Sequence, residues 1–381
     1  MYRKTYVEIN LDTIEENIKK IKTTYSGYKY YIGVVKNNAY GHGIYSINAM
    51  INGGINYLAV SSLEEALEVR KINKEIPVLI LEPISLEATK VAAENNITIT
   101  VDNTEYFDTL IENNIKVKFH LKIDSGMNRF GLKEKQKVNY IFEKSNETLY
   151  LEGIYTHLSN GRTNSEIYIN QINSFKSLTS DIDLSKIEIV HLDRSLTMEQ
   201  HEKIEFANGV RMGIAMYGIA YTAPKPSWKR RLLNKLTFKK NEIIKPKLDL
   251  NTAFEFKTHI LEVKDVKKGE IVGYGGAYDA KEDIKIALMP YGFADYLYNS
   301  MNEVYIKGKA YQVISINMDV TTILIDDTIS VGDEVEVFGK QISLRKRSRE
   351  IGQNIYKLLT SITTRVPRIY KYKNEEIEIK Y

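Results

Sequence analysis

The chain has 381 residues, 43% of them hydrophobic and 27% charged, which is typical of a globular protein long enough for two domains. A net charge of +4 is too small to indicate a nucleic-acid-binding protein. Cysteine is absent, which excludes disulfides, thiolate nucleophiles and cysteine-ligated metals, and the six histidines show no metal-like pairing. The N-terminus carries no apolar signal core, so we expect a cytoplasmic protein.

Up to about residue 215, short β-rich runs alternate with amphipathic segments. The runs predict strands at 30–36, 57–60, 77–81, 97–101, 118–123, 151–157, 187–192 and 208–213. The segments between them predict helices at 63–72, 86–95, 105–113, 134–144 and 166–180. Eight strands followed by helices predict an α/β fold, a (β/α)8 TIM-like barrel, whose functional residues come from the carboxyl ends of the strands.

From about residue 246 the pattern changes to alternation typical of antiparallel strands. The expected strands are 255–263, 284–290, 303–306, 311–316, 321–325 and 334–338, followed by a single helix at 351–361. We therefore expect two domains, a barrel at 1–245 and a C-terminal all-β domain at 246–381. The basic segment 224–247, which holds the only tryptophan, Trp228, is interpreted as a solvated linker, with a partner-binding or gating insertion as the alternative.

The most informative stretch runs from Gly33 to Gly43. Lys36 closes the apolar run 31–35, which is typical of a buried parallel strand, and the turn Tyr40-Gly41-His42-Gly43 follows it. A lysine at the end of such a strand can act as a nucleophilic amine and form a Schiff base with an aldehyde cofactor. The plain alternative is a salt-bridged lysine at a strand end.

Five further motifs follow in order. Lys122 and Arg129 lie in the stretch 121–131 at the end of the fifth predicted strand, and 210–218 ends the eighth, where barrels commonly bind phosphate. Tyr274 lies in the glycine turn 272–278. Asn317-Met318-Asp319 and Arg365-Val366-Pro367-Arg368 complete the set.

This ordered set resembles the alanine racemase family, fold-type III enzymes that use pyridoxal 5'-phosphate (PLP), and the resemblance spans Val7 to Tyr370. It implies that Lys36 and Tyr274 are catalytic and that Lys36 holds PLP as a Schiff base. It also implies the residues that bind PLP: Tyr40, Ser195, Gly213 and Ile214 at the phosphate, Arg211 at the pyridine nitrogen and His157 at the ring. Arg129 would contact Tyr274 or the substrate carboxylate, and Met318 would contact the substrate. Lys122, carbamylated in many members, would brace Arg129.

The resemblance further implies racemisation of L- and D-alanine in a head-to-tail homodimer, with Tyr274 and Met318 supplied by the partner subunit. Racemisation needs one group to remove the Cα proton and another to return it on the opposite face, while PLP serves as the electron sink. Arginine does not give up its proton, so Arg211 would keep the ring nitrogen unprotonated. For Lys122, an ion pair with Asp124 on the same strand face stays open as an alternative.

Several positions depart from the usual family pattern near the expected substrate pocket. Arg194 stands where many members have asparagine, Val320 where glutamine is common, Phe293 in place of tyrosine, and Thr364 where a tyrosine often narrows the entrance. The segment after His157, through Arg162 and Thr163, is also unusually polar. Racemisation of serine or of a broader set of amino acids is therefore an alternative, because an apolar pocket discriminates a hydroxyl only weakly.

Three other readings compete. A PLP decarboxylase of this fold usually carries a catalytic cysteine, which this chain lacks. A PLP-binding homeostasis protein without strong turnover would share Lys36 but lack the β domain. A barrel lyase using its lysine on a sugar or keto acid would bind no PLP. We expect His42 to shape its turn and Asp319 to orient the Met318 loop.

Overall fold

The computed structural model describes residues 2–161, 165–219, 248–296 and 301–379, and the chain divides into two compact units. The barrel unit comprises 14–37 and 44–251, and the β unit comprises 1–13, 38–43 and 252–381. The basic segment 224–247 with Trp228, and the loop residues Arg162 and Thr163, lie outside the described residues.

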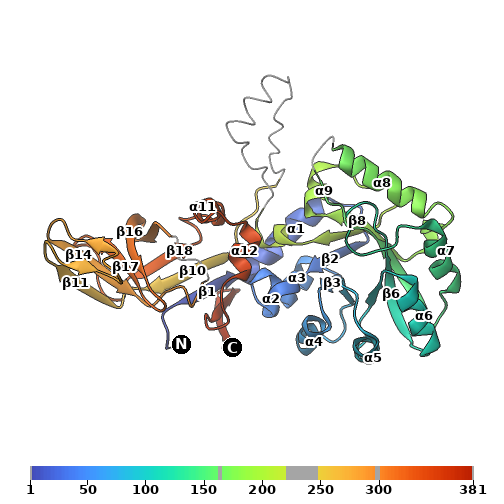
Figure 1. Ribbon diagram of the computed structural model, residues 1–381, viewed down its shortest axis with the longest axis horizontal. Coiled ribbons are helices and arrows are strands. Elements are labelled where there is room, and N and C mark those ends of the chain that lie inside the picture. Colours follow the sequence, from blue (N-terminus) through green and yellow to red (C-terminus); the bar gives the residue numbers. More distant parts are fainter. Residues whose placement is uncertain (1, 162–164, 220–247, 297–300, 380–381) are drawn as a thin grey trace, which may run out of the picture. The chain divides into compact units, whose positions relative to one another are not determined.

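Eight parallel strands form the barrel, as the alternating pattern predicts (Figure 1). They are β2 Tyr30–Val34, β3 Tyr57–Val60, β4 Val78–Ile80, β5 Ile99–Val101, β6 Val117–Lys122, β7 Leu149–Tyr155, β8 Ile189–Arg194 and β9 Gly209–Met212. Their order is β4-β3-β2-β9-β8-β7-β6-β5, and a parallel bridge between Leu79 and Thr98 joins the two ends of the sheet. The predicted barrel is therefore confirmed.

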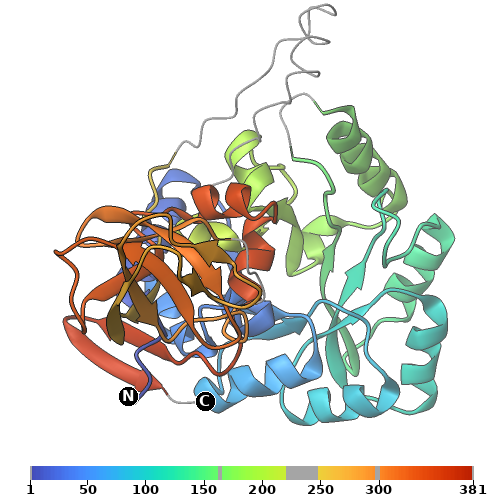
Figure 2. The same ribbon diagram turned by 60° about the vertical axis from the view of Figure 1, so that its left-hand side comes forward.

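Helices cover the outside of these strands (Figure 2). The α-helical segments described between Leu11 and Gln200 are α1 Leu11–Thr24, α2 Lys36–Tyr40, α3 Ile47–Gly53, α4 Leu63–Ile72, α5 Leu86–Glu94, α6 Thr104–Glu112, α7 Lys135–Lys144, α8 Glu166–Leu178 and α9 Ser195–Gln200. Three short 3-10 helices span Ile44–Ser46, Leu184–Lys186 and Ile214–Tyr217. Ser62, Ser85 and Asn103 begin α4, α5 and α6 as N-caps, because each side-chain oxygen accepts a hydrogen bond from a first-turn N–H.

The β unit is built on a ten-stranded sheet ordered β11-β14-β17-β16-β15-β18-β10-β1-β19-β20. The strands are β1 Tyr6–Asn10, β10 Phe254–His259, β11 Glu262–Val266, β14 Ile284–Met289, β15 Glu303–Ile306, β16 Lys309–Ile316, β17 Thr321–Ile325, β18 Glu334–Phe338, β19 Arg368–Tyr372 and β20 Glu375–Ile379. The ribbon β12 Ile271–Val272 and β13 Tyr278–Asp279 flanks the glycine turn. β1 lies between β10 and β19, so the first strand of the chain is a central strand of the β unit.

Two expectations for the β unit are wrong in detail. The strand expected at 255–263 is two strands, β10 and β11. The single helix expected at 351–361 is replaced by α11 Leu344–Glu350 and α12 Ile355–Thr360. Gly352 adopts φ +66° between them, and the Asn354 side chain accepts a hydrogen bond from the Lys357 N–H to start α12.

In the part of the chain that the structure describes, every helix is too short or too polar to cross a membrane.

Candidate active site

Lys36 follows the carboxyl end of β2, where barrel enzymes place their chemistry. Its strand is buried, Val35 is 1% exposed, and Lys36 itself is half-buried. The residues after it form a left-handed turn, with φ between +51° and +53° from Asn37 to Tyr40. The Asn37 N–H donates a hydrogen bond of 2.6 Å to Glu65 Oε1, which fixes the start of this turn to the barrel.

The second half of the turn belongs to the β unit. His42 is fully buried, its Nδ1 lies 3.2 Å from the Tyr40 carbonyl oxygen, and its ring meets Phe254 edge-on. Burial lowers the pKa of His42 to about 3, so the ring is neutral at physiological pH. Gly41, at φ +82°, must be glycine, because a Cβ would lie 2.3 Å from the Leu359 carbonyl oxygen. The Tyr40 ring packs against Tyr356 at 5.7 Å between centroids.

Arg211, on β9, has one N–H donor left for a ligand. Its Nη1 donates to His191 Nδ1 and to the His191 carbonyl oxygen, both at 2.7 Å. Its Nη2 donates to the carbonyl oxygens of Thr156 at 2.7 Å and Leu192 at 3.1 Å. Guanidinium has five N–H groups, so among the described residues only Nε–H lacks a protein acceptor. Burial lowers the pKa of Arg211 to about 10, which still leaves it cationic.

A chain of hydrogen bonds runs from Arg211 into the barrel. Because Arg211 can only donate, His191 Nδ1 is an acceptor and its Nε2 carries the proton, which it donates to His120 Nδ1 at 2.8 Å. His120 Nε2 in turn donates to Glu152 Oε2 at 3.3 Å. Each hydrogen bond in the series is therefore donated in the direction from Arg211 toward Glu152. Burial, together with the positive charge of Arg211, keeps the pKa of His191 well below its ordinary value. Sequence reasoning missed this chain.

Glu152 is the buried carboxylate at the end of this series of hydrogen bonds. Its Oε2 accepts hydrogen bonds from Tyr57 Oη at 2.6 Å and from Thr98 Oγ1 at 3.0 Å. Its Oε1 lies 2.9 Å from Lys118 Nζ. The only hint in the sequence is the alternation along β6, which puts Lys118, His120 and Lys122 on one face of the strand.

His157 follows β7 and lies in a strongly cationic environment. Burial is the main reason its pKa falls to about 2, and the positive charges of Arg211 and Arg194 lower it further. Arg194 is held there because its Nε donates to the Leu158 carbonyl oxygen at 3.0 Å. A neutral imidazole among cations provides a flat surface for a ring, and the cations favour an anionic ligand.

Ser195 and Gly213 are brought together at the ends of β8 and β9. The Gly213 N–H donates to Ser195 Oγ at 3.1 Å, and Ile214 begins the 3-10 helix Ile214–Tyr217 directly after Gly213. A hydroxyl and backbone N–H groups at a helix start form the type of site that binds phosphate. Three of the residues expected at the phosphate therefore lie next to each other.

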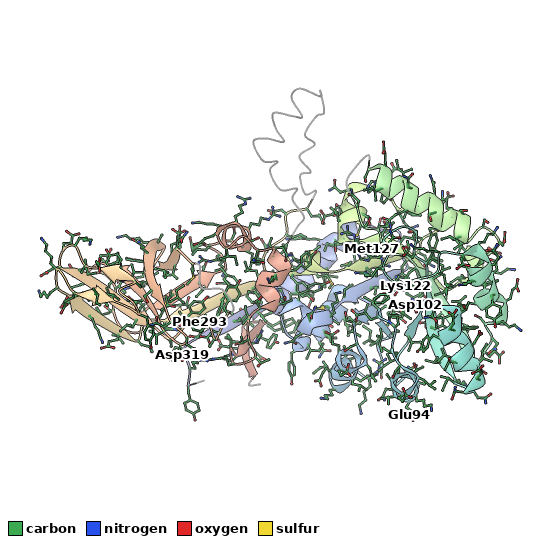
Figure 3. The ribbon with its side chains drawn as sticks, viewed as in Figure 1. Glu94, Asp102, Lys122, Met127, Phe293 and Asp319 are labelled. Atoms are coloured by element: carbon green, nitrogen blue, oxygen red, sulfur yellow. The ribbon has the colours of Figure 1, made fainter. Side chains whose placement is uncertain are left out.

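Lys122 lies at the end of β6 (Figure 3). It is 4% exposed. Burial, and then the positive charges of Arg129 and Arg211, lowers its pKa to about 8. Its Nζ donates to the Leu81 carbonyl oxygen at 3.3 Å and lies 5.2 Å and 5.3 Å from the ring centres of Phe130 and Tyr155.

The alternative of a Lys122–Asp124 ion pair does not form among the described residues. Asp124 Oδ1 instead accepts hydrogen bonds from the N–H groups of residues 126, 127 and 128, and Oδ2 accepts one from Arg129 N. Asp124 thus shapes the loop that carries Arg129, whose side chain is exposed.

In the β unit, Tyr274 lies in its glycine turn with 86% of its surface exposed. Gly273, Gly275 and Gly276 have φ of +80°, +64° and +70°, which L-residues rarely adopt. A Cβ on Gly273 would also lie 2.4 Å from Ser315 Oγ. The turn therefore presents the phenol outward on a backbone that only glycine accommodates.

Met318, 57% exposed, lies on a second loop of the β unit, next in sequence to Asp319, which Figure 3 shows near Phe293. The N–H groups of Phe293 and Ala294 donate to the carbonyl oxygens of Asn317 and Met318 at 3.1 Å and 3.0 Å. Gly292 lies so close that a Cβ would be 2.2 Å from the Met318 carbonyl oxygen.

An ion-pair network fixes this loop. Arg365 pairs with Asp319 at 2.8 Å and with the fully buried Asp295 at 3.0 Å, and Asp295 also pairs with Arg3. Asp319 therefore orients the Met318 loop, as expected. The role of Asp295 was missed, because its partners lie at distant points of the sequence.

These features define a class: an α/β-barrel enzyme that has a lysine at the end of a strand and, at the same end of the barrel, cationic side chains and groups of the type that suits a phosphate. Comparison with known proteins places the chain within that class. The alanine racemase N-terminal domain model matches residues 9–221 and the C-terminal domain model matches 253–370. The chain belongs to the alanine racemase family.

Individual relatives match this chain over nearly their whole length. The chain is 32% identical to alanine racemase 2 of Caldanaerobacter subterraneus, covering 99% of this chain and 97% of the relative. It is 30% identical to alanine racemase 1 of Bacillus subtilis, covering 100% and 96%. The solved structure of alanine racemase from Bacillus anthracis with bound L-Ala-P superposes with a TM-score of 0.86 at 29% identity, covering 100% and 98%.

The cofactor of this family is PLP, and the residues described above fit it. Ser195, Gly213 and Ile214 suit its phosphate, and the remaining N–H of Arg211 suits its ring nitrogen. The cations around His157 match the overall negative charge of the cofactor.

Proposed function

We propose that the protein racemises alanine, with PLP as cofactor and with Lys36 and Tyr274 as the two bases. Family membership across both domains supports this reaction. The single observation that carries the residue assignment is Arg211, whose one remaining N–H is a fixed, cationic donor for a ring nitrogen.

PLP, when bound, supplies the electron sink that makes a Cα proton removable. Lys36 Nζ then holds or releases that proton on one face of the substrate, and Tyr274 Oη does so on the other. Arg211 would hold the ring nitrogen of the cofactor by donating from its remaining N–H, and it would keep its own proton, so the ring nitrogen would stay unprotonated. The residues that would bind its phosphate are Tyr40, Ser195, Gly213 and Ile214, and His157 would orient its ring.

Arg129 binds the substrate carboxylate or supports the Tyr274 phenolate, and Lys122 braces it. The lowered pKa of Lys122 gives a larger neutral fraction, which is the form that reacts with carbon dioxide to give a carbamate. A carbamate would convert Lys122 from a cation that repels Arg129 into an anion that attracts it.

The active unit is a head-to-tail homodimer in this proposal. The exposure of Tyr274 and of Met318 supports it, because a base that acts on a desolvated substrate must be covered in the active assembly. The partner subunit would supply both residues. The PLP-homeostasis alternative is disfavoured, because the C-terminal domain model matches the β unit that such a protein would lack.

Serine racemisation is the second candidate. Phe293, 38% exposed beside the Met318 loop, offers no hydroxyl, and Thr364 is smaller than the tyrosine frequent in the family. A wider, less specific pocket follows from both changes. A racemisation assay across the common L-amino acids decides: kcat/KM at least tenfold higher for serine than for alanine would overturn the alanine assignment.

The cofactor assignment is tested with Lys36→Ala. The purified variant should lose the visible absorbance of bound PLP and its trapping by borohydride, whereas Lys20→Ala, an exposed lysine on α1, should keep both. Retained absorbance with borohydride labelling at another lysine would refute the role of Lys36.

A further inference from the structure

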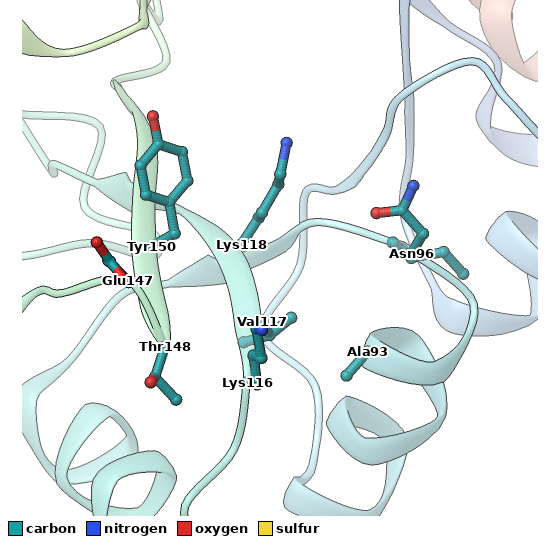
Figure 4. A pocket seen from close by; sticks show the side chains of 9 residues that line it. Ala93, Asn96, Lys116, Val117, Lys118, Glu147, Thr148 and Tyr150 are labelled. Atoms are coloured by element: carbon teal, nitrogen blue, oxygen red, sulfur yellow. The ribbon is translucent and has the colours of Figure 1, made fainter.

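A pocket of about 340 Å³ lies at the amino-terminal ends of β5, β6 and β7 (Figure 4). Lys36 follows the carboxyl end of β2, so this pocket is at the opposite end of the parallel barrel from the candidate active site. Its size is within the range of small-molecule sites. Its polar lining consists of Asn96, Lys116, Lys118, Glu147, Thr148 and Tyr150.

The pocket walls are preformed. Arg70, 8% exposed, donates from Nη2 to the Asn96 carbonyl oxygen at 2.7 Å and from Nε to the Asn95 carbonyl oxygen at 2.9 Å. Asn96 itself has φ +52°, which directs the chain around the pocket. On the facing side, the Thr148 carbonyl oxygen accepts a hydrogen bond of 2.9 Å from Val117 N–H.

The side chains offer several hydrogen-bond donors on one side. Figure 4 shows Lys118 between Tyr150 and Asn96, with the ammonium, phenol and amide turned the same way. Lys118 Nζ lies 5.9 Å from the Tyr150 ring centre. Lys116 forms no ion pair within the described part of the chain, and two lysines against Glu147 leave the lining net positive.

We propose that this pocket binds a small oxyanion through Lys116, Lys118, Asn96 and Tyr150, and that its occupancy is transmitted to the cofactor. Ammonium, amide and phenol groups are the donors that phosphate or carboxylate oxygens accept. Glu147 at the same pocket disfavours ligands of high negative charge. The ligand class is therefore a compact phosphate or carboxylate compound.

The transmission follows from Lys118, which is also the partner of Glu152. An anion beside Lys118 weakens the ion pair between Lys118 Nζ and Glu152 Oε1. Glu152 Oε2 then becomes a stronger hydrogen-bond acceptor for His120. That change is relayed through His191 to Arg211 along the chain of one-way donors. This second step rests on the proposed placement of Arg211 at the ring nitrogen, whereas the binding step does not.

Binding is tested on the PLP-loaded enzyme by calorimetric titration with inorganic phosphate, since PLP then fills its own phosphate site. Lys116→Gln and Lys118→Gln should each weaken binding about tenfold, the value of one charge-assisted hydrogen bond. Lys20→Gln, at an exposed lysine remote in sequence from the pocket, is the matched control and should bind as wild type. Absence of binding in wild type, or equal binding in the Lys116 variant, overturns the site.

A crystal soaked in selenate gives a second measurement that does not depend on whether Lys118→Gln folds. The anomalous peak should lie within hydrogen-bond distance of Lys118 Nζ and Asn96 Nδ2, and a peak found only elsewhere contradicts the site. The coupling is read from the visible spectrum of bound PLP, which should shift on phosphate titration in wild type and Lys20→Gln, and in Lys116→Gln only at phosphate concentrations about tenfold higher. Binding without that shift overturns the coupling alone.

Discussion

Glu152 offers a sharp test of the polar barrel interior. Its carboxylate accepts hydrogen bonds from Tyr57, Thr98 and His120 and pairs with Lys118. Glu152→Gln keeps the shape of the side chain but removes its charge and turns one acceptor atom into a donor. The new amide N–H group is itself a buried donor, and it faces at least one of the four existing donors, so it has no acceptor.

The cost follows from these contacts. A buried donor left without an acceptor costs about 1–3 kcal/mol, and the remaining hydrogen bonds lose their charge assistance, roughly 1 kcal/mol more. The Lys118 pair adds little, because its lysine side chain is 51% exposed. The total of about 2–4 kcal/mol corresponds to a Tm lower by roughly 5–15 °C for a unit of this size.

Calorimetry of the variant measures this loss, with Glu188→Gln as the control. Glu188 also accepts a hydrogen bond from a tyrosine, Tyr30 at 2.7 Å, but it is exposed, so its substitution should change stability by no more than about 0.5 kcal/mol. Equal Tm values for Glu152→Gln and wild type would refute the proposed role of the buried carboxylate.

The difference in stability between wild type and Glu152→Gln should depend on pH, and the direction of that dependence can be predicted. Burial alone would raise the pKa of Glu152, but hydrogen bonds from His120, Tyr57 and Lys118 hold it well below the ordinary 4.5. A depressed folded-state pKa contributes stability that is present above the unfolded value and lost as the pH falls through the folded value. The gap in stability between wild type and Glu152→Gln should therefore narrow on acidification below about pH 4.5, and a widening gap contradicts the assignment.

Three predictions concern the proposed chemistry. Tyr274→Phe should keep the visible absorbance of PLP but lose about 10²–10⁴-fold of racemisation in both directions, the usual contribution of an acid–base group; a loss below tenfold removes Tyr274 from that role. Mixing inactive Lys36→Ala and Tyr274→Phe subunits should restore activity, because one site of each heterodimer then has both bases, and no recovery contradicts shared sites. Thr364→Tyr should raise the ratio of kcat/KM for alanine over serine by narrowing the pocket, and an unchanged ratio shows that Thr364 does not set specificity.

The barrel could be predicted because its strands are short, buried apolar runs separated by amphipathic helices, a local pattern. The β unit was harder to predict from the sequence than the barrel. All of β1 except Asn10 is buried, but its partners β10 and β19 lie some 245 to 360 residues away, and nothing local in the sequence indicates them. The apolar spacing of 351–361 resembles a helix, yet Gly352 and the Asn354 cap start the helix only at Ile355.

In the candidate site, too, some residues could be predicted from local sequence patterns and others could not. Three site residues can be recognised from the sequence: Lys36, Lys122 and Arg211. Each is a charged residue at the end of a buried strand, and charged side chains are rarely buried there unless they have a partner or a ligand. The chain from Arg211 to Glu152 was missed because its members come from β6, β7, β8 and β9, and only closure of the barrel brings them together. Alternation places a side chain inside a barrel but does not specify which residue on another strand faces it.

The turn after Lys36 explains why so short a motif is informative. A left-handed turn costs an L-residue roughly 1–2 kcal/mol, so Ala39 and Tyr40 together store about 2–4 kcal/mol. Asn37 and Asn38 tolerate this conformation better, and the Asn37 hydrogen bond to Glu65 offsets part of the cost. Gly41 and Gly43, at φ +82° and +88°, continue the turn where other residues would be strained. Most of the motif is therefore set by backbone geometry, and Lys36 is the residue that this geometry holds at the end of the strand.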